Sequence, residues 1–211
     1  MEISIWVESL LRHIAVIIAI VVGSLVLKHL STRQKIIYGL LWLVLIFGIW
    51  ATIRISNGLY SIIVYNIGGL FFFSARVLYV NYELKDWGKK YLFNIPALLL
   101  LSSFPIHWFL NDLNKWNELA PLIHLLLSVF LFYSIIKNPV NIADQVLRWA
   151  QLIFCLGDFI IVLFDNEITW ELPINIGLDL LILHYSIANL ELIMITISFC
   201  LAYWQSKRSL Q

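Results

Sequence analysis

The chain has 211 residues, of which 61% are hydrophobic and only 13% are charged, and its mean hydropathy is +0.87. A soluble domain of this size is about half apolar and about a quarter charged, so one soluble core cannot hide this apolar surface. The composition also excludes a disordered chain and a disulfide scaffold, and a net charge of +1 excludes a strongly basic nucleic-acid binder. We therefore expect an all-α integral membrane protein that forms a single transmembrane helical domain over residues 1–211.

Uncharged stretches between charged residues mark the expected membrane spans. A helix needs about 20 apolar residues to cross the hydrocarbon core. Four charge-free runs meet that length, and three more apolar stretches carry only scattered charges. The sequence thus predicts a seven-transmembrane-helix bundle with helices at about 6–28, 36–54, 58–80, 90–110, 119–136, 140–164 and 174–205.

Local signals refine this prediction at three places. The first expected span has a long apolar stretch and no small-residue cleavage site after it, which favours a retained helix over a cleaved signal peptide. Asn138 and Pro139 are typical of a cap and first-turn pair, so we expect them to start the sixth helix. Cys155 and Cys200 both fall inside expected helices, which predicts two buried structural thiols.

Basic residues predict the orientation, because they accumulate on the cytoplasmic side of a membrane protein. In the seven-span arrangement eleven Lys and Arg residues lie on one side, and only Arg12, Arg54 and Lys115 lie on the other. We expect the N-terminus outside, the C-terminus in the cytoplasm, and a multi-pass protein of the plasma (inner) membrane. Arg76 is the one basic residue that enters the inner part of a span, and we expect it to extend to the cytoplasmic surface.

Acids and histidines inside the expected spans are the candidates for function. A charge inside a membrane helix costs about 2.5–3.5 kcal/mol on insertion scales, which makes such residues functional candidates by default. The expected ligand- or proton-binding residues are Glu191, His184, Asp158, Asp179, His124 and Asn189. Most of them fall in the outer half of the bilayer, so the sequence predicts an outward-biased intramembrane polar pocket.

The helix expected at 174–205 carries the most informative pattern. His184, Glu191 and Ser198 are seven residues apart, which keeps them on one helix face. His184 and Glu191 are about 10 Å apart along the axis, too far to pair but placed to line one water-filled path. Asp179 and Asn189 fall toward another side of the same helix. We therefore expect this helix to lie inside the bundle and to be the functional helix.

Each candidate also has a purely structural interpretation. Asp179 and His107 sit near expected helix ends, where headgroup water can reach them. His124 can be a packing histidine with a backbone partner. Asp158 and Glu191 can be protonated links between helices.

Several seven-helix families lack their required residues here. A retinal opsin needs a lysine in the last helix, and none lies between Asn175 and Trp204. Membrane hydrolases of the ceramidase type need an H-x-x-x-H pair, but Ala188 stands four residues after His184. No Pro-Gln pair of the seven-helix sugar transporters, rhomboid G-x-S-G or zinc-protease H-E-x-x-H occurs.

Three functions stay open on the sequence. The leading hypothesis is transport or proton-coupled translocation of a small solute or ion, because carboxylates with histidines suit proton binding. The second is a sensor or accessory subunit that signals to a separate cytoplasmic partner. The third is an intramembrane metal-dependent hydrolase built on His107, His124 and His184. We expect no cofactor, no bound metal and no nucleic acid; the expected partners are the lipid bilayer, a small-molecule or ion ligand, and either a second copy or a separate membrane or cytoplasmic protein.

Overall fold

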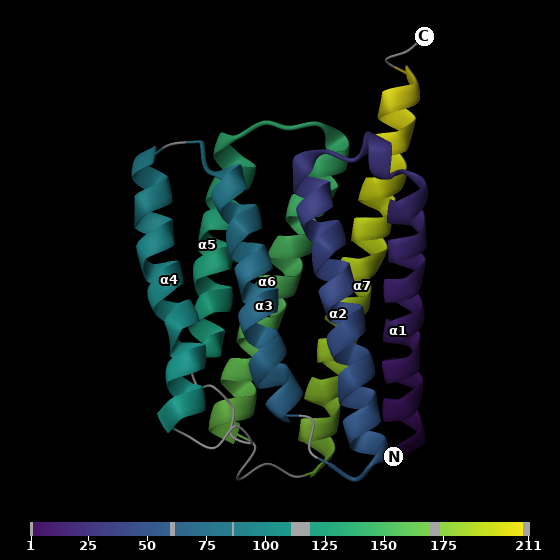
Figure 1. The fold of residues 1–211 in the computed structure, drawn as a ribbon, viewed down its shortest axis with the longest axis vertical. Helices are drawn as coiled ribbons and strands as arrows, with labels where there is room; N and C mark the ends of the chain where they lie inside the picture. The colour runs from purple at the N-terminus through teal and green to yellow at the C-terminus, as the bar shows by residue number, and fades with distance from the viewer. Residues whose placement is uncertain (1, 60–61, 86, 111–118, 169–173, 209–211) are drawn as a thin grey trace.

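The described part of the chain is helical throughout. The computed structural model describes residues 2–59, 62–85, 87–110, 119–168 and 174–208, and these form seven α-helices and one short 3-10 turn (Figure 1). Each helix overlaps one of the ranges expected from the sequence. The helices are α1 Glu2–Leu25, α2 Thr32–Ser56, α3 Ile62–Glu83, α4 Trp87–Leu110, α5 Ala120–Lys137, α6 Ile142–Ile168 and α7 Ile174–Arg208, with the turn η1 at Leu27–His29.

Polar side chains start two of the helices. Ser31 caps α2 by accepting from the backbone N–H of Gln34, whose side chain accepts from the backbone of Ser31, the reciprocal capping-box arrangement. Asn141 accepts from the backbone N–H of Asp144 at 2.8 Å and so caps α6. The expectation that Asn138 and Pro139 start the sixth helix is wrong, because Asn138 is the residue that ends α5.

The helices run alternately up and down, and neighbours in sequence pack side by side (Figure 1). α7 packs between α1 and α6, so the last helix closes back on the first. α3 contacts α2, α4 and α5, while α4 lies at one edge of the bundle against α3 and α5. The chain ends lie at opposite ends of the bundle, and we refer to these as the N-terminal and C-terminal ends.

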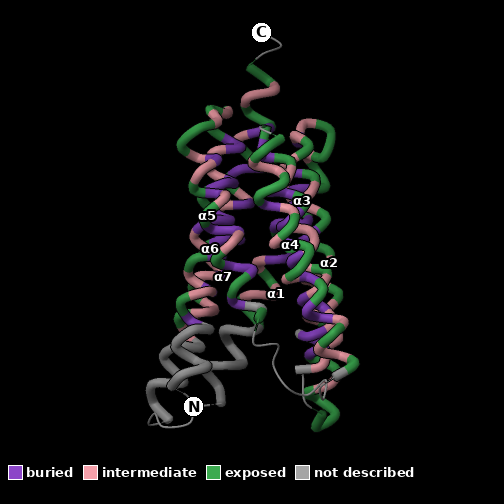
Figure 2. Tube along the Cα trace, turned by 90° about the vertical axis from the view of Figure 1, so that its left-hand side faces the viewer, coloured by how far each residue is buried: buried purple, intermediate pink, exposed green. Residues whose placement is uncertain are grey.

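The bundle exposes apolar side chains and buries many polar ones. Buried residues follow the inside of the bundle and exposed residues its outside (Figure 2). Large apolar residues on α4 are exposed, such as Leu98 at 64% and Leu99 at 67%, whereas Arg148 and Glu83 are at 0%. This is the reverse of a water-soluble protein, in which charged residues are almost never fully buried. Segments Thr32–Ser56, Trp87–Phe109 and Ile182–Arg208 are long and apolar enough to cross a membrane.

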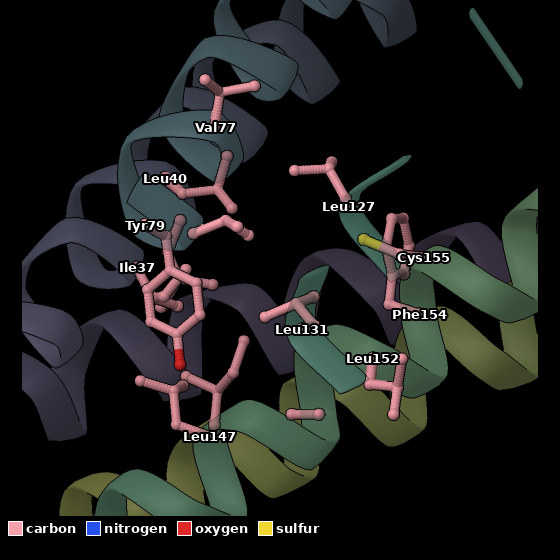
Figure 3. Close-up of a cluster of buried hydrophobic side chains, with 14 of the residues drawn as sticks. Ile37, Leu40, Val77, Tyr79, Leu127, Leu131, Leu147, Leu152, Phe154 and Cys155 are labelled. Carbon is pink, nitrogen blue, oxygen red and sulfur yellow. The ribbon is translucent and has the colours of Figure 1, made fainter. Parts of the chain in front are cut away.

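An apolar core joins all seven described helices, and Figure 3 shows the part of it between α2, α3, α5 and α6. Leu127 and Leu131 of α5 and Leu147 of α6 are completely buried in it, and the hydroxyl of the buried Tyr79 is directed toward Leu147. Cys155 is buried among these residues, as expected. Cys200 is exposed on α7, which corrects the expectation of two buried thiols; both cysteines are free.

Close packing at Gly23 gives a test of the α1–α2–α7 contact. A Cβ atom at Gly23 would lie 2.6 Å from Tyr38 Cδ2 and 2.9 Å from Phe199 Cε2. Because the buried ring of Phe199 cannot move aside freely, we expect Gly23→Ala to lower the free energy of unfolding in detergent by about 1–3 kcal/mol. The control is Gly39→Ala, since nothing lies within 4 Å of a Cβ there, and we expect it to be neutral or stabilising by about 0.5–1 kcal/mol. Equal effects in a denaturant titration would contradict this packing.

Candidate functional site

Helices α6 and α7 share a polar seam with a seven-residue repeat. α6 carries Asp144, Gln151 and Asp158, and antiparallel α7 carries His184, Glu191 and Ser198. Position 158 lies opposite 184 and 151 opposite 191, and Ser198 bonds to the backbone of Ala143, the neighbour of Asp144. We call this seam the α6–α7 ladder. Its three levels, named after Asp158, Glu191 and Asp144, are separated by about 10 Å at 1.5 Å per residue.

At the Asp158 level, one carboxylate holds two imidazoles from different helices. His124 Nε2 of α5 lies 2.8 Å from Asp158 Oδ2, and His184 Nδ1 lies 2.7 Å from Asp158 Oδ1. His124 is buried against the ring of Phe73, whereas the His184 side chain is 27% exposed. A carboxylate, rather than the expected backbone group, is therefore the partner of His124. With neutral imidazoles the trio carries a charge of −1.

At the Glu191 level, one carboxylate oxygen accepts from two helices. Arg76 Nη2 of α3 donates to Glu191 Oε1 at 2.9 Å, and Gln151 Nε2 donates to the same oxygen at 2.8 Å. The Arg76 guanidinium also stacks over the Phe154 ring, with Cζ 4.2 Å from the ring centroid. Arg76 and Glu191 are only 6% and 5% exposed. The expectation that Arg76 extends to the surface is therefore wrong.

A small cavity borders this ion pair. Its volume is about 60 Å³, which is room for a few water molecules. Its charged lining residues are Arg12 of α1, Arg76 and Glu191, so two basic residues and one acidic residue border the cavity. Arg12 was assigned from the sequence to the outer side, but it lines the interior here. The rest of the lining is apolar and is made by Leu40, Leu41, Val44, Phe72, Phe154, Ala188, Leu192 and Ile195.

At the Asp144 level, four charged residues form a buried network near the C-terminal end. We call Arg33, Glu83, Asp144 and Arg148 the Glu83 cluster. Glu83 accepts from Arg148 Nε at 2.9 Å and also from Arg148 Nη2. Arg33 Nε lies 2.6 Å from the other Glu83 oxygen, and Arg33 Nη1 donates to Asp144 at 3.2 Å. Two positive and two negative groups from α2, α3 and α6 thus neutralise each other.

Neutral groups extend the Glu83 cluster to α5 and α7. Arg148 Nη1 donates to the carbonyl oxygen of Asn138, which ties the end of α5 to α6. The buried Gln34 donates to the backbone and hydroxyl oxygens of Ser198 at 3.0 and 2.9 Å. Ser198 in turn donates to the carbonyl oxygen of Ala143 at 2.7 Å. Five helices therefore meet around this one neutral network.

The remaining candidates do not join the ladder in the same way. Asp179 lies on α7, but its side chain falls outside the described residues. Asn189 is half-buried on α7, and its Oδ1 has no hydrogen-bond partner in the structure. His184 and Glu191 each contact a different partner on α6, Asp158 for His184 and Gln151 for Glu191. No group of three or more His, Cys, Asp and Glu side chains is placed to hold a metal ion in the described ranges.

Sequence reasoning missed the Glu83 cluster entirely. Arg33 and Arg148 were counted as loop charges, and Glu83 and Asp144 were not singled out. One available signal was the spacing of Asp144, Gln151 and Asp158, which repeats the seven-residue pattern seen in the last helix.

Comparison with known proteins gives no relative from which a function could be transferred. No family model, no curated protein and no solved structure matches this chain. The function therefore has to be argued from the buried groups themselves.

The charge balance of the Glu83 cluster gives a stability test. Glu83→Gln leaves two arginines with only Asp144, and we expect it to lower the free energy of unfolding in detergent by about 3–5 kcal/mol. Adding Arg148→Met restores a balanced Arg33–Asp144 pair. The double variant should therefore lose less than the sum of the single variants, with a coupling of about 0.5–3 kcal/mol.

A matched control is Asn94→Ala, which removes the 3.3 Å bond to Asn81 between α3 and α4. This pair is neutral, so we expect a loss of only about 1 kcal/mol. Additive effects of Glu83→Gln and Arg148→Met would show that the two side chains do not form a pair.

Proposed function

We propose that the chain is a seven-span membrane protein, with its N-terminus outside, that moves a small solute or ion coupled to protons. The basic residues support this orientation even after the buried ones are removed. Without the buried Arg76 and Arg148 the eleven on one side become nine, against three on the other. Exposed arginine and lysine still accumulate at the C-terminal end, the side expected in the cytoplasm.

The observation that carries this proposal is the set of three ionisable levels along one helix interface. A single buried pair is sufficient to link two helices, and each charge inside a membrane costs about 2.5–3.5 kcal/mol on insertion scales. A protein that buries ionisable groups at three depths pays this free-energy cost at each depth, and helix association alone does not require it. Proton relays in membrane proteins are built from such chains of carboxylates and histidines.

The levels differ in a way that suits controlled passage. Toward the N-terminal end, the His184 side chain at the Asp158 level is 27% exposed. At the opposite end the Glu83 and Arg148 side chains are 0% exposed and neutralise each other. We infer that this conformation is closed at the C-terminal end and that passage requires the Glu83 cluster to separate. Steps of about 10 Å between levels are too long for direct proton transfer from one side chain to the next, so water near Glu191 has to bridge them.

A sensor is the second candidate, and the length of α7 favours it. α7 has 35 residues, about 52 Å at 1.5 Å per residue, and it projects beyond the other helices at the C-terminal end (Figure 1). A helix that carries all three levels and continues past the bundle is suited to report ligand binding to a separate partner. The metal-dependent hydrolase gains no such support, since His124 and His184 share the Asp158 carboxylate.

The topology can be tested with single cysteines at the two ends of α2. In a Cys155→Ala, Cys200→Ala background we expect Lys35→Cys to react with a membrane-impermeant maleimide only after cells are permeabilised. Ser56→Cys should react in intact cells. Both positions are exposed, so the reagent can reach them. Labelling of position 35 in intact cells would reverse the proposed orientation.

Proton binding can be tested without knowing the substrate. We expect a pH step to drive a transient charge displacement in proteoliposomes on a solid-supported membrane. Asp158→Asn or Glu191→Gln should reduce it at least severalfold, because each amide keeps the side-chain volume but cannot take up a proton. Asn94→Ala is the control. A wild-type signal in the Asp158→Asn, Glu191→Gln double variant, with a normal elution profile, would reduce the ladder to a structural link.

A further inference from the structure

The charge of the cavity beside Glu191 points to a ligand class. Arg12 and Arg76 contribute two positive charges to its wall and Glu191 contributes one negative charge, so the wall has a net charge of +1. A buried site with unbalanced positive charge is suited to a small anion. Arg76 Nε is buried and has no hydrogen-bond partner in the structure, and Arg76 is itself only 6% exposed. The Arg76 guanidinium therefore has a buried donor without a hydrogen-bond partner beside the cavity.

The shape of the Arg76 guanidinium and the lining of the cavity narrow the class of ligand further. Arg76 already binds a carboxylate, that of Glu191, at 2.9 Å, and the planar guanidinium fork matches carboxylate geometry. The rest of the lining is aliphatic and aromatic, which suits a short hydrocarbon group. At about 60 Å³ the cavity is smaller than the roughly 150 Å³ cavity known to take benzene. We propose that the cavity binds a short monocarboxylate of acetate size between Arg12 and Arg76.

Glu191 makes this binding depend on protons. When Glu191 is ionised, its carboxylate forms the ion pair with Arg76. When Glu191 takes a proton from water, Arg76 loses its counter-charge, the wall charge rises from +1 to +2, and the ligand carboxylate replaces that of Glu191. One proton and one anion thus enter together, and the binding of each strengthens the binding of the other.

Among the groups that surround Glu191, Glu191 itself is the one that competes with the ligand for Arg76. In the described part of the chain, Arg12 faces it from α1 and Arg76 from α3, while Gln151 of α6 is neutral. Cys155 and Asp158 of α6 interact electrostatically with Arg76, but neither lines the cavity. α2 contributes only the apolar Leu40, Leu41 and Val44 to the lining.

This inference rests on the proposed function in using the same ladder, and binding in detergent tests it separately from transport. We expect sodium acetate, measured by titration calorimetry, to bind the wild type at least tenfold more tightly at pH 6 than at pH 8. The linkage limit is about tenfold per pH unit for one coupled proton. Glu191→Gln should bind acetate equally at both pH values, because Arg76 is permanently free of a charged partner.

Arg12→Gln tests the site without breaking an ion pair of the ladder, and we expect acetate binding to weaken at least tenfold. Lys35→Gln removes an exposed charge on α2 and should bind like the wild type. Unchanged binding in Arg12→Gln, or wild-type pH dependence in Glu191→Gln, would overturn the proposal. Chloride binding as tightly as acetate would also overturn it, since it would indicate charge attraction without carboxylate recognition.

Laurate distinguishes the source of the carboxylate. Tighter binding of laurate than of acetate would assign the site to fatty acids of the membrane. It would overturn the proposal that the ligand is a short monocarboxylate. Loss of acetate binding with an intact pH-step signal would remove this inference and leave the proposed function. The expected acetate pattern without any pH-step signal would remove proton translocation and leave a ligand site suited to the sensor.

Discussion

The need to compensate charge in an apolar bundle decides which helices meet. The Arg76–Glu191 pair links the side chains of α3 and α7, and Asp158 links α6 to the histidines of α5 and α7. The Glu83 cluster joins α2, α3 and α6 for the same reason. Apolar side chains cannot specify such partners, because in a bilayer the lipid tails are as apolar as the leucines they would replace.

The two arginine-containing levels solve this problem differently. In the Glu83 cluster two arginines meet two acids, and neutral donors and acceptors from α5 surround them. Around Glu191 two arginines meet one acid and a cavity. The first arrangement is balanced in charge, while the second has an imbalance of charge beside a buried Arg76 Nε that has no hydrogen-bond partner. A stabilising role for the first and a binding role for the second follow from this difference.

The sequence predicts features that depend on neighbouring residues, such as helix positions, but it does not predict contacts between residues that are far apart in the chain. Helix positions follow from runs of apolar residues, and the polar face of α7 follows from the spacing of His184, Glu191 and Ser198. The partners of these residues lie far away in sequence, since Arg76 and Glu191 are 115 residues apart and Glu83 and Arg148 are 65 apart. Such pairs depend on how each helix rotates about its axis, which no run length reveals. For the same reason the sequence pattern of Arg76 and Arg148 is that of ordinary flanking charges, although both side chains are buried in the bundle.

The continuity of α7 has a mechanical consequence. All three levels use a residue of this one helix, and within Ile174–Arg208 it contains no proline and one glycine, Gly177, near its start. Sharp kinks arise mainly at proline, glycine or bulges, so the length from His184 to Ser198 moves as a stiff rod. Its contacts at the three levels are 2.7–3.0 Å long, and an axial slide of one residue, about 1.5 Å, displaces its side of every one of them by the same amount. A movement of α7 that opens the bundle at one end therefore also moves its contacts at the other end, without a chain of side-chain rearrangements between the two ends.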